Sequence, residues 1–224
     1  MLTQFVPLAV TKASNEEACV GAVAESGEWV RPEPIAVEDV QADAAPYRYF
    51  WWTAADLGPS RAADCRPEDR ALGRNPVTPC VLTDRPPEDR AAFLNRHLDA
   101  DVEAAFSGTR SLGLVRVHVR RLYAKRSTGG RLFLRAEFSD DAASTFDWIV
   151  PELAFSREVE PFVIDGELDT SFASHLVALF ERRPTYFAVG LTKPNHRFPG
   201  RFRGCHPLVV GIHTVPDYRT FSLR

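Results

Sequence analysis

Basic and aromatic side chains alternate in two stretches of the second half of this sequence. Lysine and arginine attract a phosphate backbone, and unpaired bases stack on aromatic rings. These residue types therefore favour binding of nucleic acid, and single-stranded DNA or RNA above all. The candidate binding residues are Arg116, Arg120, Tyr123, Lys125, Arg126, Arg131 and Arg135 in the first stretch, and Lys193, Arg197, Phe198, Arg201, Phe202 and Arg203 in the second.

The same two stretches also have a structural interpretation. Lysine and arginine at strand edges keep a sheet from aggregating, and Phe133 and Tyr186 suit a hydrophobic core. Residues 195–203 are harder to explain in this way, because Phe198 and Phe202 stand among basic residues where no regular strand would bury them. We therefore expect both of these phenylalanines to be exposed.

A different chemistry would need a titratable pair or a metal site. His213 and Asp217 are four residues apart and could act as a general acid–base pair. We favour the interpretation in which Asp217 caps a turn and Tyr218 packs beneath a barrel. Cys205 and His206 could join His213 as metal ligands, but an odd separation along one strand puts the two histidines on opposite faces. We expect no catalytic residue and no metal.

Other catalytic signatures are absent from the sequence. It has no P-loop, no Gly-rich dinucleotide turn, no G-x-S-x-G and no closely spaced pair of zinc ligands. The four cysteines are scattered without a C-x-x-C pair, which is typical of reduced thiols in a cytosolic protein. We expect no cofactor, and an enzyme is not the favoured interpretation.

Two alternatives to nucleic-acid binding stay open. In the first, the chain is a protein-interaction module of a multi-gene bacterial system, and Trp51 or Trp52 docks a partner encoded in the same operon. In the second, the chain is an enzyme that acts on nucleic acid or nucleotides through His213 and Asp217.

Composition sets the frame for these hypotheses. The chain has 224 residues, of which 45% are hydrophobic and 25% charged, the ordinary mix of a globular protein. Its net charge of -3 does not indicate a nucleic-acid binder, so the local basic clusters must supply the attraction. No secretory signal and no apolar run of the ~20 residues needed to cross a bilayer is present. We expect a cytoplasmic protein without membrane contact.

Strand patterns dominate the elements that would position these residues. We expect a three-strand meander at the N-terminus, a strand at 47–57, a long hairpin formed by 112–126 and 131–138, and closing strands within 184–194 and 206–218. Further strands are expected in the segments TFDWIVPEL and REVEPFVID. Apolar residues at helical spacing predict helices over about 84–106 and 171–182. Residues 58–79 form a long loop.

The order of these elements is strands, helix, strands, helix, strands, which argues against a doubly wound parallel sheet. Short strands joined by tight turns fit small barrels. We therefore expect a mostly β protein with two helices, built as two OB-like small β-barrels packed together. The expected domains are residues 1–108, which include the long loop and a helix, and residues 109–224, which include the basic hairpin and the basic loop.

Both ends of the chain resemble the bacterial dual OB-containing domain family. The first end carries the motifs VTK, CVGAV and GEWVRP, and the last carries VGLT and GIHTVPDY. The resemblance implies two OB-like barrels and suggests nucleic-acid binding without assigning a reaction. The matching positions are Val10, Thr11, Lys12, Cys19, Gly21, Gly27, Trp29, Val30, Arg31, Pro32, Gly190, Leu191, Thr192, Gly211, Ile212, His213, Asp217 and Tyr218.

Overall fold

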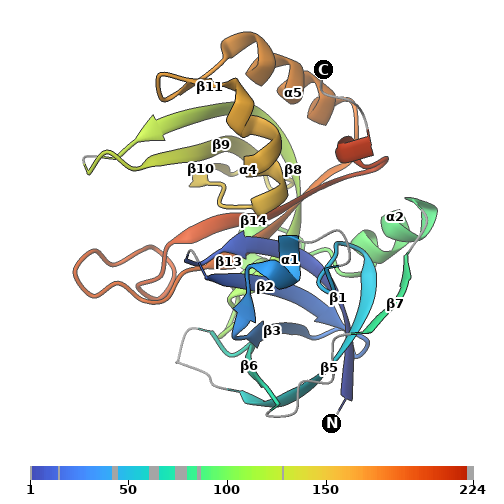
Figure 1. Cartoon of the computed structure of the whole chain (residues 1–224). Helices are drawn as coiled ribbons and strands as arrows, with labels where there is room; N and C mark the ends of the chain where they lie inside the picture. The colour runs from blue at the N-terminus through green and yellow to red at the C-terminus, as the bar shows by residue number, and fades with distance from the viewer. Residues whose placement is uncertain are drawn as a thin grey trace.

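Two rings of strands pack against each other in the computed structural model of the chain (Figure 1). The structure describes residues 2–14, 16–41, 45–60, 66–73, 80–84, 87–127 and 129–220. The protein is mostly β, and each half contains a small ring of strands compatible with an OB-like barrel, which confirms the predicted fold class. Among the described residues, no helix has the length and apolar character needed to span a bilayer.

The N-terminal ring begins with the predicted meander. It contains β1 (Leu2–Lys12), β2 (Glu17–Ala24), β3 (Trp29–Glu33), β5 (Trp51–Ser60) and β6 (Asp69–Leu72). The strands follow the order β1-β2-β3-β6-β5, and β5 pairs with β1 to close the ring. Only β3 and β6 run parallel in this ring; the other ring pairs are antiparallel. Two further strands extend it: β4 (Ile35–Ala36) pairs with β2, and β7 (Cys80–Asp84) pairs with β5. The short helix α1 (Glu38–Gln41) follows β4 in the chain.

The C-terminal ring is a closed barrel. It contains β8 (Leu112–Arg126), β9 (Leu132–Asp140), β10 (Thr145–Ile149), β13 (Thr185–Leu191) and β14 (Pro207–Thr214), in the order β10-β14-β13-β8-β9. Here β10 and β14 form the parallel pair. If the strands of each ring are numbered one to five along the chain, both rings follow the order 1-2-3-5-4, and in both the third and fifth strands are parallel. The two halves therefore share one connectivity, although the sequence contains no clear internal repeat that would predict it.

The segment between β10 and β13 covers one end of the closed barrel. It contains α4 (Leu153–Val159), a 3-10 turn (Glu160–Phe162), the hairpin of β11 (Val163–Ile164) and β12 (Glu167–Leu168), and α5 (Thr170–Glu181). The predicted strand in REVEPFVID is wrong in its first half. The helix α4 extends into that half instead. It begins after Glu152, whose side chain accepts a hydrogen bond from the backbone N–H of Phe155. The predicted second helix is confirmed as α5, and its cap is Asp169.

The first predicted helix, over 84–106, is wrong as a single element. It divides into α2 (Pro87–Arg96) and α3 (Val102–Ala105). Asp99 lies between them, and its carboxylate accepts hydrogen bonds from the backbone N–H of Leu114 and the guanidinium of Arg110. Asp101 then caps α3 by accepting from the N–H of Ala104 at 2.7 Å. The predicted strand at 47–57 begins later than expected, at Trp51, because Phe50 has a positive φ of 63°.

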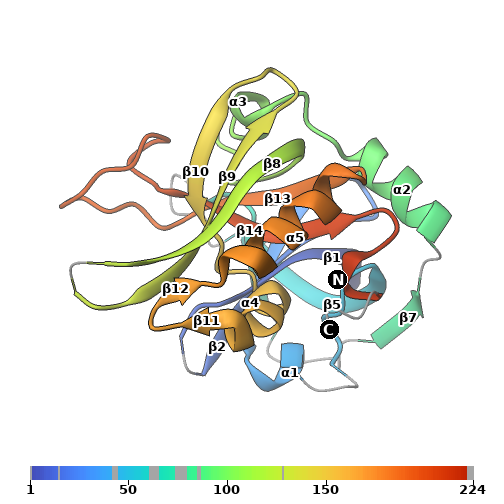
Figure 2. The same ribbon diagram turned by 90° about the horizontal axis from the view of Figure 1, so that it is seen from above.

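The long hairpin of β8 and β9 is confirmed and projects well beyond the barrel (Figure 2). Alternating side chains bury Val115, Val117 and Val119 on the inner face. A register shift between Val119 and Arg121 then lets Leu122 return to that face, where it is 4% exposed.

A shared core joins the two rings. Leu8 and Val23 of the first ring pack in one buried cluster with Leu112 and Val210 of the second, and α2 adds Phe93 to it. Trp29 is 9% exposed and belongs to the same cluster, as expected for a structural corner. The relative placement of the rings is therefore fixed by apolar packing as well as by the polar contacts described below.

Candidate nucleic-acid interface

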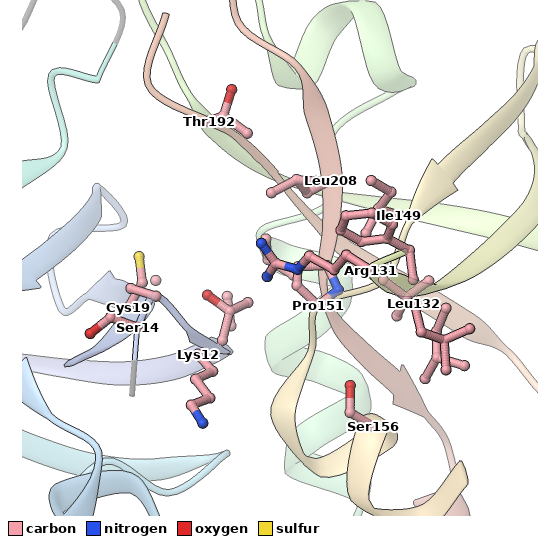
Figure 3. Close-up of a pocket in the computed structure, with 18 of the residues that line it drawn as sticks. Lys12, Ser14, Cys19, Arg131, Leu132, Ile149, Pro151, Ser156, Thr192 and Leu208 are labelled. Carbon is pink, nitrogen blue, oxygen red and sulfur yellow. The ribbon is translucent and has the colours of Figure 1, made fainter. Parts of the chain in front are cut away.

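A cleft of about 1290 Å³ lies between the two rings. Figure 3 shows Lys12, Ser14 and Cys19 on its N-terminal side and Arg131, Leu132 and Ile149 on its C-terminal side. Glu160 and Asp165, from the segment that covers the barrel, also contribute to its lining. The cleft is therefore built from segments more than a hundred residues apart in the chain.

The outward face of the basic hairpin leads into this cleft. Tyr123 pairs with Arg135 across β8 and β9, and Arg135 pairs in turn with Ile149 of β10. Lys125 lies opposite Phe133 in the same ladder. Since alternate residues of a strand point to opposite faces, Tyr123, Lys125, Phe133 and Arg135 share one surface, while Ala136 and Phe138 point into the core.

Arg135, on this face, is already neutralised. The guanidinium of Arg135 donates to the carboxylate of Asp147 at 2.9 Å, and the hydroxyl of Tyr123 donates to the same carboxylate at 2.7 Å. Burial pushes the pKa of Asp147 upward, but the hydrogen bonds from Arg135 and Tyr123 outweigh it and leave that pKa below its usual value. Arg135 therefore orients Tyr123 more than it offers a free positive charge.

Three basic residues near the tip of the hairpin keep their charge available. Within the described part of the chain, no carboxylate forms an ion pair with Lys125, Arg126 or Arg131, and all three side chains are exposed. The guanidinium of Arg131 lies 5.1 Å from the ring centre of Phe133, which itself is half-buried in the cleft wall. A cation beside an aromatic ring is the arrangement that a phosphate and its base can share.

Part of the basic loop between β13 and β14 is also exposed. Phe198 is 64% exposed, and Arg197 lies with its guanidinium 5.6 Å from that ring. The side-chain oxygen of Asn195 accepts hydrogen bonds from the backbone N–H groups of both residues, so the loop holds a defined turn. Lys193, at the start of the loop, is exposed beside Thr192, which lines the cleft.

The second half of this loop is fastened to the barrel instead. Phe202 is 8% exposed and packs on Phe106 with ring centres 4.7 Å apart, so the expectation that it is exposed is wrong. Arg203 donates to the carbonyl oxygens of Phe106 and Gly108, and Arg201 pairs with Glu103 of α3. The residues directly after α3 supply an apolar ring and carbonyl groups that the local sequence of the loop does not reveal.

Two further predicted residues lie outside the cleft lining. Arg116 is half-buried, with its guanidinium 5.6 Å from the ring centre of Tyr186, and it donates to Asn95 of α2. Arg120 is exposed on β8. The predicted set therefore divides into residues at the cleft, residues on the adjoining hairpin face, and residues that hold α2 and α3 in place.

Sequence reasoning missed the N-terminal side of the cleft. Lys12 is exposed at the end of β1 and lines the cleft together with Thr11 and Ser14. A signal existed: Lys12 ends the first strand of its ring much as Lys125 lies near the end of the first strand of the other. That equivalence becomes visible only once both rings are known to share their connectivity.

His213 and Asp217, the residues of the acid–base alternative, have separate partners in the structure. His213 is 1% exposed, and its Nε2 lies 2.7 Å from the carbonyl oxygen of Leu8. Asp217 accepts from the backbone N–H of Arg219 at 3.0 Å and pairs with Arg90, while Tyr218 is fully buried. The turn cap and the buried tyrosine match the favoured interpretation. In the described ranges, no three His, Cys, Asp or Glu side chains gather as a metal site.

Comparison with known proteins adds no relative: a scan against protein-family models finds no match to the chain, and a search of curated proteins finds none at a significant level.

Proposed function

We propose that this chain binds single-stranded nucleic acid on the outward face of β8, β9 and β10 and in the adjoining cleft. The observation that carries the proposal is the exposed Arg131 beside the ring of Phe133, with Lys125 opposite on the neighbouring strand. Bases would stack on the ring, and the two cations would contact phosphates. The proposal includes membership of the dual OB-containing domain family and a role inside the bacterial cell.

The connectivity of the closed barrel supports this location. OB-folds bind oligonucleotides with their second and third strands and with the loops that follow the first and fourth strands. In this barrel those elements are β9, β10, the β8–β9 tip and the β13–β14 loop. Figures 1 and 2 show that the tip and the loop project from the same side of the molecule. The basic residues with available charge lie on these elements.

Fluorescence anisotropy with a labelled dT12 oligonucleotide tests the proposal. Phe133→Ala removes the stacking ring and should weaken binding by about 1–3 kcal/mol. Arg131→Gln should weaken binding too, whereas Arg182→Gln, an exposed cation at the end of α5 that does not line the cleft, should not. Equal losses for Arg131→Gln and Arg182→Gln would show only nonspecific attraction, and tighter binding to a duplex than to dT12 would contradict the proposal.

A further inference from the structure

The lysines of this chain gather around one cleft. The sequence contains 24 arginines but only three lysines, which are Lys12, Lys125 and Lys193. Lys12 lines the cleft, Lys125 pairs across the hairpin with Phe133 of the lining, and Lys193 directly follows Thr192 of the lining. All three side chains are exposed. They come from three separate segments, and one of these belongs to the N-terminal ring.

Corresponding strands of both rings form the walls of this cleft. The second and third strands of the N-terminal ring contribute Cys19 and Arg31, and those of the C-terminal barrel contribute Phe133 and Ile149. The surface used for binding in the C-terminal barrel therefore faces the equivalent surface of its neighbour. At about 1290 Å³, the space exceeds the roughly 300–1,000 Å³ typical of small-molecule sites, which suits a segment of a polymer.

Two buried polar networks keep the cleft open at a fixed width. In the first, the hydroxyl of Tyr49, two residues before β5, donates at 2.5 Å to Glu152, which starts α4 and is fully buried. In the second, Arg31 donates to Asp69 at 2.6 Å and to the hydroxyl of Ser111 at 3.2 Å. Both networks cross from one half of the chain to the other. Because the rings are locked together, the cleft is preformed and needs no hinge motion to receive a strand.

From this arrangement we infer that a single nucleic-acid strand lies across both rings, with phosphates beside Lys12, Lys125 and Lys193 and a base against Phe133. The inference rests on the proposed function and extends it, because it makes the N-terminal ring part of the binding site. Lys12 and Lys125 lie at equivalent ends of the first β-strand of each ring. They then hold successive parts of the same nucleic-acid strand.

Amine labelling resolved by peptide mass spectrometry tests the inference in one experiment. The intact chain is treated with an acetylating reagent, with and without saturating dT12 or U12, and the labelling rate is followed at each lysine. Bound oligonucleotide should slow labelling severalfold at Lys12, Lys125 and Lys193 alike. The thiol of Cys19, half-buried in the cleft wall, should lose reactivity toward iodoacetamide, while Cys205, 0% exposed, stays unreactive throughout.

The possible results separate the two proposals. Protection of Lys125 without protection of Lys12 or Cys19 would overturn the inference and leave the proposed function standing. If dT12 and U12 bind nowhere, so that no lysine is protected, the proposed function fails and the inference fails with it.

Lys12→Gln gives an independent check on the same point. The side chain is exposed at a strand end, so its removal should leave the melting temperature unchanged. Loss of one phosphate contact should make the negative slope of log K against log salt shallower by about 0.7. Arg182→Gln serves as the matched control and should leave the slope unaltered. An unaltered slope in Lys12→Gln, with binding intact, would overturn the inference.

Discussion

His213 Nε2 lies 2.7 Å from the carbonyl oxygen of Leu8, and this hydrogen bond joins residues 205 positions apart in the chain. A carbonyl oxygen only accepts, so Nε2 carries the proton and donates. The other ring nitrogen, Nδ1, is buried without a hydrogen-bond partner among the described residues. The imidazole is therefore held neutral where the N-terminal and C-terminal rings of strands meet. It lies next to the aromatic side chains of Tyr49 and Phe50.

This contact predicts that acid weakens the fold. The pKa of His213 is lowered to about 3, chiefly by burial and also by the nearby charges of Arg219 and Arg90, against which the bond to Leu8 acts only in part. In the unfolded chain the histidine takes up a proton near pH 6.5. The contribution of neutral His213 to the free energy of unfolding is therefore complete above that pH and falls as the pH decreases toward 3. We expect a loss of about 2 kcal/mol in the free energy of unfolding between pH 7 and pH 5.

Urea denaturation of the wild type and of His213→Gln measures this effect. The glutamine keeps an amide donor for Leu8 but cannot titrate, so the wild type should lose about 2 kcal/mol more than the variant over the same pH range. The comparison also cancels the contribution of Glu152, because both proteins contain it. Burial is the main cause that raises the pKa of Glu152, so its protonation stabilises the fold as the pH decreases. Parallel pH profiles for the two proteins would mean that His213 is not the titrating group.

Gly211→Ala should separate or unfold the rings. A β-carbon at Gly211 would lie 2.1 Å from the carbonyl oxygen of Leu8, and backbone cannot move aside as a side chain does. We expect a loss of about 3 kcal/mol in the free energy of unfolding, read from urea denaturation. Gly129→Ala is the control, because the nearest atom to its β-carbon would be 3.8 Å away. A stable Gly211→Ala protein would show that the contact between the rings is looser than described.

The two phenylalanines of the basic loop should behave differently. Phe198→Ala removes an exposed ring, so stability should change by less than about 0.5 kcal/mol, while affinity for dT12 should fall by about 1–3 kcal/mol. Phe202→Ala opens a cavity beside Phe106 and should cost about 3 kcal/mol of stability. Thermal melts and anisotropy on both variants check the contrast. Similar effects of the two changes on both quantities would contradict the assignment of one ring to the surface and the other to the core.

Strands and turns of this fold can be predicted from sequence because their signals are local. The alternation from Leu112 to Arg126 fixes the hairpin and its outward face without any knowledge of the partner barrel. The break between α2 and α3 depends instead on Asp99, whose carboxylate is held by Leu114 and Arg110 in the next element. Apolar spacing alone continues through that point, so a single helix is the natural prediction.

The candidate site could be predicted only in part, for a related reason. Residue types indicate binding chemistry at Lys125, Arg131 and Phe198, which stay exposed in the fold. Burial of Phe202 requires Phe106, which is nearly a hundred residues away. The part played by Lys12 requires the closure of two rings through their parallel third and fifth strands. Such long-range pairings leave no periodic trace in the sequence.

Salt dependence of binding tests the central claim most directly. Anisotropy of labelled dT12 and U12 is recorded with the wild-type chain between 50 and ~300 mM salt. Contacts from Lys12, Lys125 and Lys193 to three phosphates predict binding at low salt and a slope of log K against log salt of about -2 or steeper. Absence of binding at low salt, or an affinity that salt does not weaken, would contradict the account.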